Sequence, residues 1–182
     1  MTPTDFWLDI GAGSDAEHWA ATPAPPGVRR IALDPLITSG RVRSGTLAPL
    51  PADVLRLGAE LRPPGSVDPG KEASYLPFRS GSLAWVHCGY VLHLFLELRE
   101  LLAAESHRVL RDGGELTVLL PHFGESRSDT IIRETHAVLQ ACFGSAVLAE
   151  YRGAASTFWA DLYRGRSFEI RCVKRDEARA EG

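Results

Sequence analysis

The sequence has few cysteines and no long hydrophobic run. Its three cysteines, Cys88, Cys142 and Cys172, are far apart, and no C-x-x-C pair occurs. Neither a zinc-binding motif nor a disulfide framework is therefore indicated, so we predict no metal site and a reduced, cytoplasmic setting. No apolar stretch approaches the roughly 20 residues that cross a bilayer. The N-terminus also lacks the charged head and apolar core of a secretory signal, and we expect no membrane association.

The sequence also has no strong excess of either charge. Its formal net charge is −3, with acidic and basic residues interspersed, which argues against a protein that works mainly by neutralising nucleic acid. A length of 182 residues with 45% hydrophobic composition suffices for one domain with a sizeable core, and a second full domain would not fit. We therefore predict a single domain over residues 1–175 and a frayed tail at 176–182.

Hydrophobic patterns predict alternating strands and helices. Strands are expected in the segments DFWLDI (5–10), VRRIALD (28–34), SLAWVHCGYVL (82–92), ELTVLLP (115–121), SAVLAEY (145–151) and RSFEIRCVKR (166–175). Helices are expected in DAEHWAA (15–21), ELRELLAAESHRVL (97–110) and SDTIIRETHAVLQACF (128–143). The glycines Gly113 and Gly114 read as the stop signal of the second helix, and Ser128 or Asp129 as the cap of the third. This order is typical of a parallel α/β sheet.

Residues 36–70 form a proline- and glycine-rich excursion. They include Pro49, Pro51, Pro63, Pro64 and Pro69. Within them, ADVLRL (52–57) fits either a third strand or a short helix after a proline, and we favour the helix. We expect the excursion to lie on the surface and to cover part of the functional site.

The first strand runs into a glycine loop, FWLDIGAGSDA (6–16). Gly11, Gly13 and Ala16 satisfy the nicotinamide pattern G-x-G-x-x-G/A, so a dinucleotide is one candidate ligand. However, Asp9 stands where dinucleotide folds normally have an apolar residue, and a carboxylate is costly to bury unless something uses it. A cationic ligand group, such as the ammonium of S-adenosylmethionine, would use it, whereas a pyrophosphate would be repelled.

Four motifs together resemble a known family. The pattern D-x-G-x-G, the acid Asp34 closing the second strand, LPF followed by Ser80, and ESHRVLRDGGELTV are similar to class I S-adenosylmethionine-dependent methyltransferases, especially small members of the methyltransferase type 11 kind. The likeness runs from about residue 6 to 121. It implies an α/β, Rossmann-like, doubly wound and mostly parallel seven-stranded sheet with an antiparallel C-terminal strand.

The resemblance also implies a cofactor site for S-adenosyl-L-methionine. Its residues would be Asp9, Gly11, Ala12 and Gly13 beneath the methionine and ribose, Asp34 and Pro35 at the ribose hydroxyls, Glu72 and Ala73 at the adenine, and His87 and Cys88 at the end of the fourth strand. Glu60, in LGAE (57–60), is an alternative to Glu72 for the adenine.

The methyl acceptor is not identified by the sequence. Methyl transfer is an in-line displacement in which the protein mainly positions the reactants, and a base is needed only for a protonated nucleophile. The candidates for that base are His122, Tyr90 and His93, in that order. The chain shows no N-terminal helices and, beyond residues 36–70, no inserted substrate domain. We therefore expect an acceptor site that is open, suited to a large or carrier-bound substrate, or completed by a second subunit of a homo-oligomer. Among acceptors, we favour a small molecule or a carrier-bound substrate.

Several positions depart from the family pattern and support a second interpretation. Asp15 in the glycine loop, Ala84 in place of a common Asp, and Leu94 in place of a common His favour a methyltransferase-like fold that no longer catalyses and serves as a binding or scaffold subunit. A nicotinamide-binding protein is a third reading, and Asp9 together with RVLRDGG argues against it.

Overall fold

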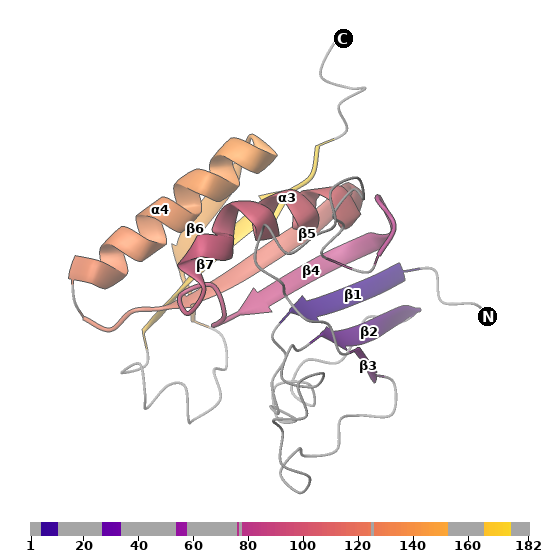
Figure 1. Ribbon diagram of the computed structural model, residues 1–182, viewed down its shortest axis with the longest axis horizontal. Coiled ribbons are helices and arrows are strands. Elements are labelled where there is room, and N and C mark those ends of the chain that lie inside the picture. Colours follow the sequence, from indigo (N-terminus) through magenta and orange to yellow (C-terminus); the bar gives the residue numbers. More distant parts are fainter. Residues whose placement is uncertain are drawn as a thin grey trace, which may run out of the picture.

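Seven strands form one sheet among the residues that the computed structural model describes (Figure 1). The structure describes residues 5–10, 27–33, 54–57, 76, 78–124, 126–152 and 166–175. The strands are β1 (Asp5–Ile10), β2 (Val28–Leu33), β3 (Val54–Leu57), β4 (Leu83–Gly89), β5 (Leu110–Pro121), β6 (Ala146–Glu150) and β7 (Ser167–Val173).

The strand order is β3-β2-β1-β4-β5-β7-β6. Strands β1 to β5 pair in parallel, and β7 runs antiparallel to both of its neighbours. From β1, the strands β2 and β3 follow on one side of the sheet, and β4 and β5 follow on the other side. This reversal of strand order is the topology of a doubly wound sheet. The predicted fold class, mostly parallel with an antiparallel C-terminal strand, is confirmed.

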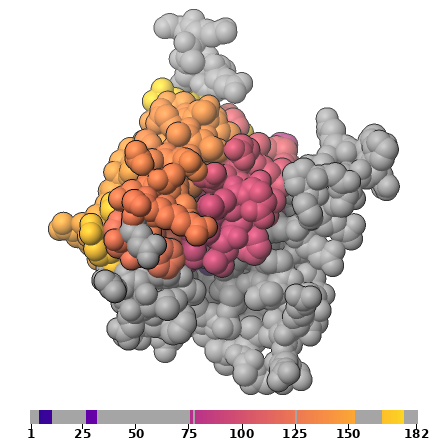
Figure 2. All heavy atoms as spheres, turned by 60° about the vertical axis from the view of Figure 1, so that its left-hand side comes forward, coloured from indigo at the N-terminus to yellow at the C-terminus, as the bar shows by residue number. Residues whose placement is uncertain are grey.

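In the described part of the chain, two α-helices cover one face of the sheet. They are α3 (Arg99–Val109), preceded by the short 3₁₀ helix η1 (Leu96–Leu98), and α4 (Ser126–Phe143). They pack against each other, and their surfaces lie side by side in Figure 2. Both predicted helices are confirmed. The predicted cap of α4 is wrong, because the helix begins at Ser126 and Ser128 is a buried residue of its first turn.

The two faces of the sheet differ in chemistry. One cross-strand row consists of Leu8, Val86, Leu116 and Cys172, which belong to the buried core with α3 and α4. The adjacent row on the opposite face consists of Asp9, His87, Thr117 and Arg171. Because side chains alternate along each strand, a polar row crosses four strands directly behind the aliphatic core.

Two local predictions are wrong. The segment Val54–Leu57 is strand β3, not a helix, because it pairs in parallel with β2, opposite Arg30 to Leu33. The glycines Gly113 and Gly114 do not end α3, which already stops at Val109. They lie inside β5, where the register with β4 shifts.

The glycine pair makes that irregularity possible. Gly113 has φ +75°, in the left-handed region that side chains disfavour. A Cβ on Gly114 would lie 2.8 Å from the backbone oxygen of Arg111 and 3.1 Å from that of Ala84. The two glycines of RDGG therefore fit a bulge-like irregularity inside β5, where residues 111–114 lie opposite Ala84, rather than a helix end.

Several predictions concern residues outside the described part of the chain. They are the helix at 15–21, the tail at 176–182, and the site residues Gly11, Ala12, Gly13, Asp34, Pro35, Glu72 and Ala73. Among the described residues, no group of three or more His, Cys, Asp or Glu side chains could hold a metal ion. None of the described helices is both long and apolar enough to span a bilayer.

Candidate functional site

The candidate site is the edge of the sheet where the parallel strands end. In open α/β sheets, ligands bind outside the carboxyl ends of the strands, at the point where the strand order reverses. Here that point lies between β1 and β4. The ends of β1, β4 and β5 and the start of β7 bring together Asp9, the segment 87–93, His122 and Ser167.

Asp9 is the acid of this edge. It is only 4% exposed, and it lies opposite His87 of β4, so the two side chains leave the sheet on the same face. Gly89 keeps space for the histidine, since a Cβ there would lie 2.9 Å from Nε2 of His87. A buried carboxylate and a histidine therefore stand side by side at the switch point.

Cys88 faces the other side of β4. Its side chain is fully buried in the hydrophobic core. Burial, reinforced by the negative charge of Asp9, raises the pKa of the Cys88 thiol far above its ordinary value. The thiol therefore stays protonated, and only the main chain of Cys88 is available to a ligand at the edge.

Tyr90 directly follows β4 in a strained backbone conformation. Its φ is 57°, and its N–H donates to the carbonyl of Leu119 at 2.9 Å. Its hydroxyl lies 2.9 Å from Oγ of Ser167 at the start of β7. Burial raises the pKa of the half-buried Tyr90. The phenol is therefore un-ionised at neutral pH and suited to hydrogen bonding. Left-handed residues other than glycine cluster at functional sites.

His122 is held at both ring nitrogens. Its Nδ1 accepts the N–H of Gly124 at 3.1 Å, and its Nε2 lies 3.1 Å from Oδ1 of Asp129 on α4. Since Nδ1 acts as an acceptor, the proton of the neutral ring is on Nε2 and is donated to Asp129. The ring also packs 5.6 Å from that of Phe168. In this arrangement, the lone pair on Nδ1, which a general base would use to accept a proton, already accepts the N–H of Gly124 in the loop after β5.

His93 lies in the loop after β4, with its ring 5.9 Å from that of Phe123. Burial lowers the pKa of this half-buried histidine to about 4, so it is neutral at pH 7. Around it, Leu94, Phe95 and Phe123 are exposed hydrophobic side chains. The loops after β4 and β5 thus give this edge an apolar rim.

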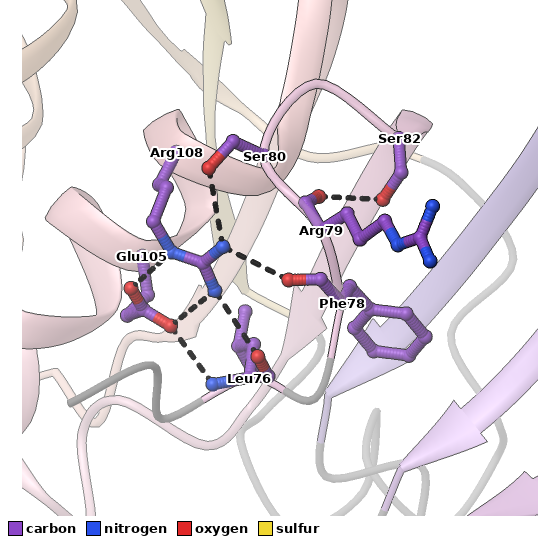
Figure 3. Close-up of polar contacts among 7 residues, drawn as sticks. All are labelled: Leu76, Phe78, Arg79, Ser80, Ser82, Glu105 and Arg108. Atoms are coloured by element: carbon purple, nitrogen blue, oxygen red, sulfur yellow. Dashed lines mark hydrogen bonds and ion pairs between the residues drawn. The ribbon is translucent and has the colours of Figure 1, made fainter. Parts of the chain in front are cut away.

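An ion pair between a buried carboxylate, Glu105, and the partly exposed Arg108 holds the segment that leads into β4 (Figure 3). Glu105 on α3 is 6% exposed, and its Oε2 accepts the N–H of Leu76 at 2.8 Å. Arg108 donates to both carboxylate oxygens of Glu105, to the carbonyl of Leu76 at 3.1 Å and to that of Phe78 at 2.9 Å. Its Nη1 also lies 3.4 Å from Oγ of Ser80.

This clamp explains two motifs of the sequence at once. LPF and ESHRVL are far apart in the chain, and the ion pair of the second motif binds the backbone of the first. Sequence reasoning did not foresee the contact. The available signal was the position of Glu105 among the apolar residues of an amphipathic helix, where a lone carboxylate needs a partner.

An apolar pocket adjoins the clamp. Glu105 contributes to its wall, and the other lining residues are Ile10, Leu76, Val91, Leu92, Phe95, Leu98, Leu101 and Leu102. The pocket therefore lies between the end of β1, the loop after β4 and α3. Two of the residues that depart from the family pattern lie in the described part: Ala84 is buried in β4, whereas Leu94 is exposed at the rim.

The strand order, with its reversal between β1 and β4 and its antiparallel β7, defines the fold of the class I S-adenosylmethionine-dependent methyltransferases. Known structures agree. The chain is similar to a putative methyltransferase of Haloferax volcanii in complex with the Trm112 methyltransferase activator, with TM-score 0.54 and 17% identity over 95% of this chain and 84% of that one. The predicted family resemblance is thus confirmed at the level of the fold.

Two further structures show the same likeness. A geranyl diphosphate C-methyltransferase from Streptomyces coelicolor, in complex with Mg²⁺, geranyl diphosphate and S-adenosyl-L-homocysteine, has TM-score 0.53 and 12% identity over 94% of this chain and 71% of that one. An antibiotic-related methyltransferase has TM-score 0.56 and 13% identity over 92% and 87%. The sequence itself matches no protein-family model, and no curated protein is similar to it at the sequence level.

Proposed function

We propose that the protein binds S-adenosyl-L-methionine and transfers its methyl group to an acceptor. The observation that carries this proposal is the buried carboxylate of Asp9, which ends β1 beside the switch point of a methyltransferase-type sheet. A carboxylate at that place favours a cationic ligand, and both the sulfonium and the ammonium of this cofactor are cationic. The same carboxylate disfavours the pyrophosphate of a nicotinamide cofactor.

The other cofactor contacts are proposals from the resemblance. Gly11, Ala12 and Gly13 would form the loop under the methionine, and Asp34 would accept hydrogen bonds from the ribose hydroxyls. Pro35, Glu72 and Ala73 complete the predicted set. In the described part, His87 adds a side chain on the Asp9 face, and Cys88 adds main-chain groups.

When bound, the cofactor supplies an electrophilic methyl group. The chain then has to hold the acceptor in line and keep water away, and such positioning is worth about 7–11 kcal/mol at best. The apolar rim of Leu94, Phe95 and Phe123 supports water exclusion.

The three acceptor-side candidates are best suited to positioning. His122 uses its acceptor nitrogen on Gly124, the pKa of His93 lies near 4, and that of Tyr90 is raised by burial. We therefore propose an acceptor whose nucleophilic atom needs no strong base. Replacing His122 with alanine should lower turnover by loosening the loop after β5, while leaving cofactor affinity unchanged.

A second candidate function is a catalytically silent scaffold subunit. Leu94 supports it, since an exposed leucine stands at the rim where many relatives have a histidine. The two candidates differ in cofactor binding, because a scaffold has no need to retain affinity for S-adenosylmethionine.

The test is calorimetric titration of the full chain with S-adenosylmethionine, S-adenosylhomocysteine and NAD. We expect binding of the first two, and a loss of at least tenfold in affinity for S-adenosylmethionine in Asp9→Asn, because the isosteric amide removes the charge. The matched control is Asp5→Asn on the same strand, whose carboxylate lies 2.8 Å from Arg111 at the opposite end of β1. Its affinity should be unchanged.

Three other outcomes would contradict the proposal. Absence of heat with both S-adenosyl compounds would favour the scaffold. Binding of NAD alone would restore the nicotinamide reading. Equal affinity in wild type and Asp9→Asn would remove the assignment of Asp9 to the cationic ligand.

A further inference from the structure

The strand β6 is the outer edge of the sheet. Among the strands that the structure describes, it pairs with β7 alone, and in Figure 1 it lies behind α4, beyond β7. Four of its five residues are exposed, with Val147 62% and Leu148 37% exposed. An edge strand presents a row of backbone donors and acceptors to any strand that can pair with it, and lysine or proline is the usual protection. The strand β6, AVLAE, has neither.

The hydrogen-bond pattern shows which backbone groups of β6 point outward. Tyr151 donates its N–H to the carbonyl of Ser167 at 2.8 Å, as opposite residues of a hydrogen-bonded antiparallel pair do. Alternation along the ladder then directs the N–H and C=O of Val147 and Ala149 to β7. The N–H and C=O of Ala146, Leu148 and Glu150 point away from the sheet.

Helix α4 already occupies the first of these outward positions. The N–H of Ala146 donates to Oε1 of Gln140 at 2.7 Å, and its carbonyl accepts from Nε2 of His136 at 3.1 Å. Among the described residues, none is hydrogen-bonded to the outward groups of Leu148 and Glu150. In this part of the chain, β6 therefore offers a template two pairing positions long, and α4 closes its N-terminal end.

We propose that this edge pairs with β6 of a second copy of the chain. In an antiparallel pair with the two-fold axis at Ala149, Leu148 of each copy stands opposite Glu150 of the other, and each such pair exchanges two hydrogen bonds. The outward backbone groups of Leu148 and Glu150 are then all hydrogen-bonded. The contact is isologous, because each copy contributes the same residues. An axis at Leu148 would instead place Glu150 opposite Ala146, whose groups α4 already binds.

The side chains fit the same register. On one face, Val147 lies opposite Tyr151 of the second copy, and the two small Ala149 side chains meet at the axis. On the other face, Leu148 lies opposite Glu150. The carboxylate of Glu150 lies 3.8 Å from Nε of Arg166 and 4.0 Å from Nη2 of Arg152 in its own chain. These two cations offset the repulsion between the Glu150 carboxylates of the two copies.

The first test is a cysteine cross-link. Opposite residues in a non-hydrogen-bonded antiparallel pair have Cα atoms about 4.5 Å apart, which lies within the range of a disulfide. Ala149→Cys should therefore give a disulfide-linked dimer under mild oxidation. Val147→Cys is the matched control, because two cysteines at that position would be roughly 13 Å apart along the strands. Wild type controls for Cys142, which is partly exposed.

The second test is analytical ultracentrifugation of the proline variant. Leu148→Pro removes an N–H that points outward, and it breaks no hydrogen bond to β7. Edge strands tolerate proline at such a position. It should raise the dimer dissociation constant at least about tenfold, since two hydrogen bonds are lost per dimer. Leu148→Ala keeps the N–H and should change that constant much less.

The outcomes separate the possible occupants of the edge. The proposal would be overturned by a wild type that sediments as a monomer at the highest concentration reached. A monomer is also the expected result if the natural occupant of the edge is a strand of another protein. Equal cross-linking of Ala149→Cys and Val147→Cys would overturn the register. Because β6 is far in strand order from β1 and β4, these results do not depend on methyl transfer.

Discussion

Glu105 and Arg108, one turn apart on α3, together bind Leu76 at both its N–H and its carbonyl oxygen. The arginine also donates to both carboxylate oxygens of Glu105, to the carbonyl of Phe78 and to Oγ of Ser80, and the carboxylate is buried. The pair therefore ties α3 to the segment before β4, on the side of the apolar pocket. In this chain, LPF and ESHRVL are thus joined by a structural clamp near the candidate site.

Removing the carboxylate of the clamp should destabilise the fold. Glu105→Ala leaves the guanidinium of Arg108 without its carboxylate and the N–H of Leu76 without an acceptor. We expect a loss of about 3 kcal/mol in the free energy of unfolding, measured in urea. The control is Glu134→Ala, which breaks the exposed ion pair with Arg99 and should cost less than about 1 kcal/mol. Similar losses in both variants would contradict the clamp.

Periodicity predicted the long elements and failed for a short one. The helix of residues 128–143 and the strand at 5–10 have patterns that only one structure satisfies. The four residues of β3, VLRL, fit a strand and a helical turn equally, and pairing with β2 decides between them. Likewise, the glycines of RDGG mark a turn in the backbone, but only the register of β4 against β5 shows that the turn is a bulge inside a strand.

The two glycines of that bulge should differ in their sensitivity to alanine. Gly113 has open space around it but φ +75°, so Gly113→Ala should cost about 1–2 kcal/mol of stability. At Gly114, a Cβ would meet backbone oxygens at 2.8 and 3.1 Å, which cannot move like a side chain. We expect Gly114→Ala to cost more, about 3 kcal/mol or above. Thermal unfolding of both variants measures the difference, and the reverse order would show that the bulge is misplaced.

His93 should make stability depend on pH below neutrality. Burial lowers its folded-state pKa to about 4, below the ordinary value of 6.5. Between these values the unfolded chain binds the proton and the folded chain does not, so this contribution is complete above pH 6.5 and is lost as the pH falls toward 4. His93→Gln should flatten that part of the curve by on the order of 1 kcal/mol, since partial exposure screens the effect. Urea titrations at pH 4.5, 5.5 and 7.5 would show it, and parallel curves would contradict it.

The position of the candidate site was predictable from residue types, and the contacts of its residues were not. Asp9 and His122 follow from the positions of strand ends, because parallel strands present those ends together. What limits His122 as a base is the N–H of Gly124 on its Nδ1, a contact between residues two apart that no pattern announces. The strained backbone of Tyr90 could not be predicted from the sequence either, since tyrosine has no preference for positive φ.

Tyr90 and Ser167 should behave as a coupled pair. Their hydroxyls lie 2.9 Å apart and link the end of β4 to the start of β7 across β5. Tyr90→Phe leaves the buried Ser167 hydroxyl without this partner, and Ser167→Ala leaves that of Tyr90. Each should cost about 1 kcal/mol, and the double variant should cost less than the sum, giving a coupling energy of about 1 kcal/mol.

The pH dependence supplies an independent check on the same pair. Burial raises the pKa of Tyr90 above its ordinary value of 10, so ionisation above pH 10 favours the unfolded chain, and the stability due to the neutral phenol is lost as the pH rises. Tyr90→Phe should remove that part of the alkaline loss. Ser167→Ala should retain it and enlarge it, because burial raises the pKa of Tyr90 and the hydrogen bond with Ser167 lowers it. If the single costs were additive and the alkaline limbs of all variants superimposed, the hydroxyl contact would have no energetic weight, and Tyr90 would be held by its backbone alone.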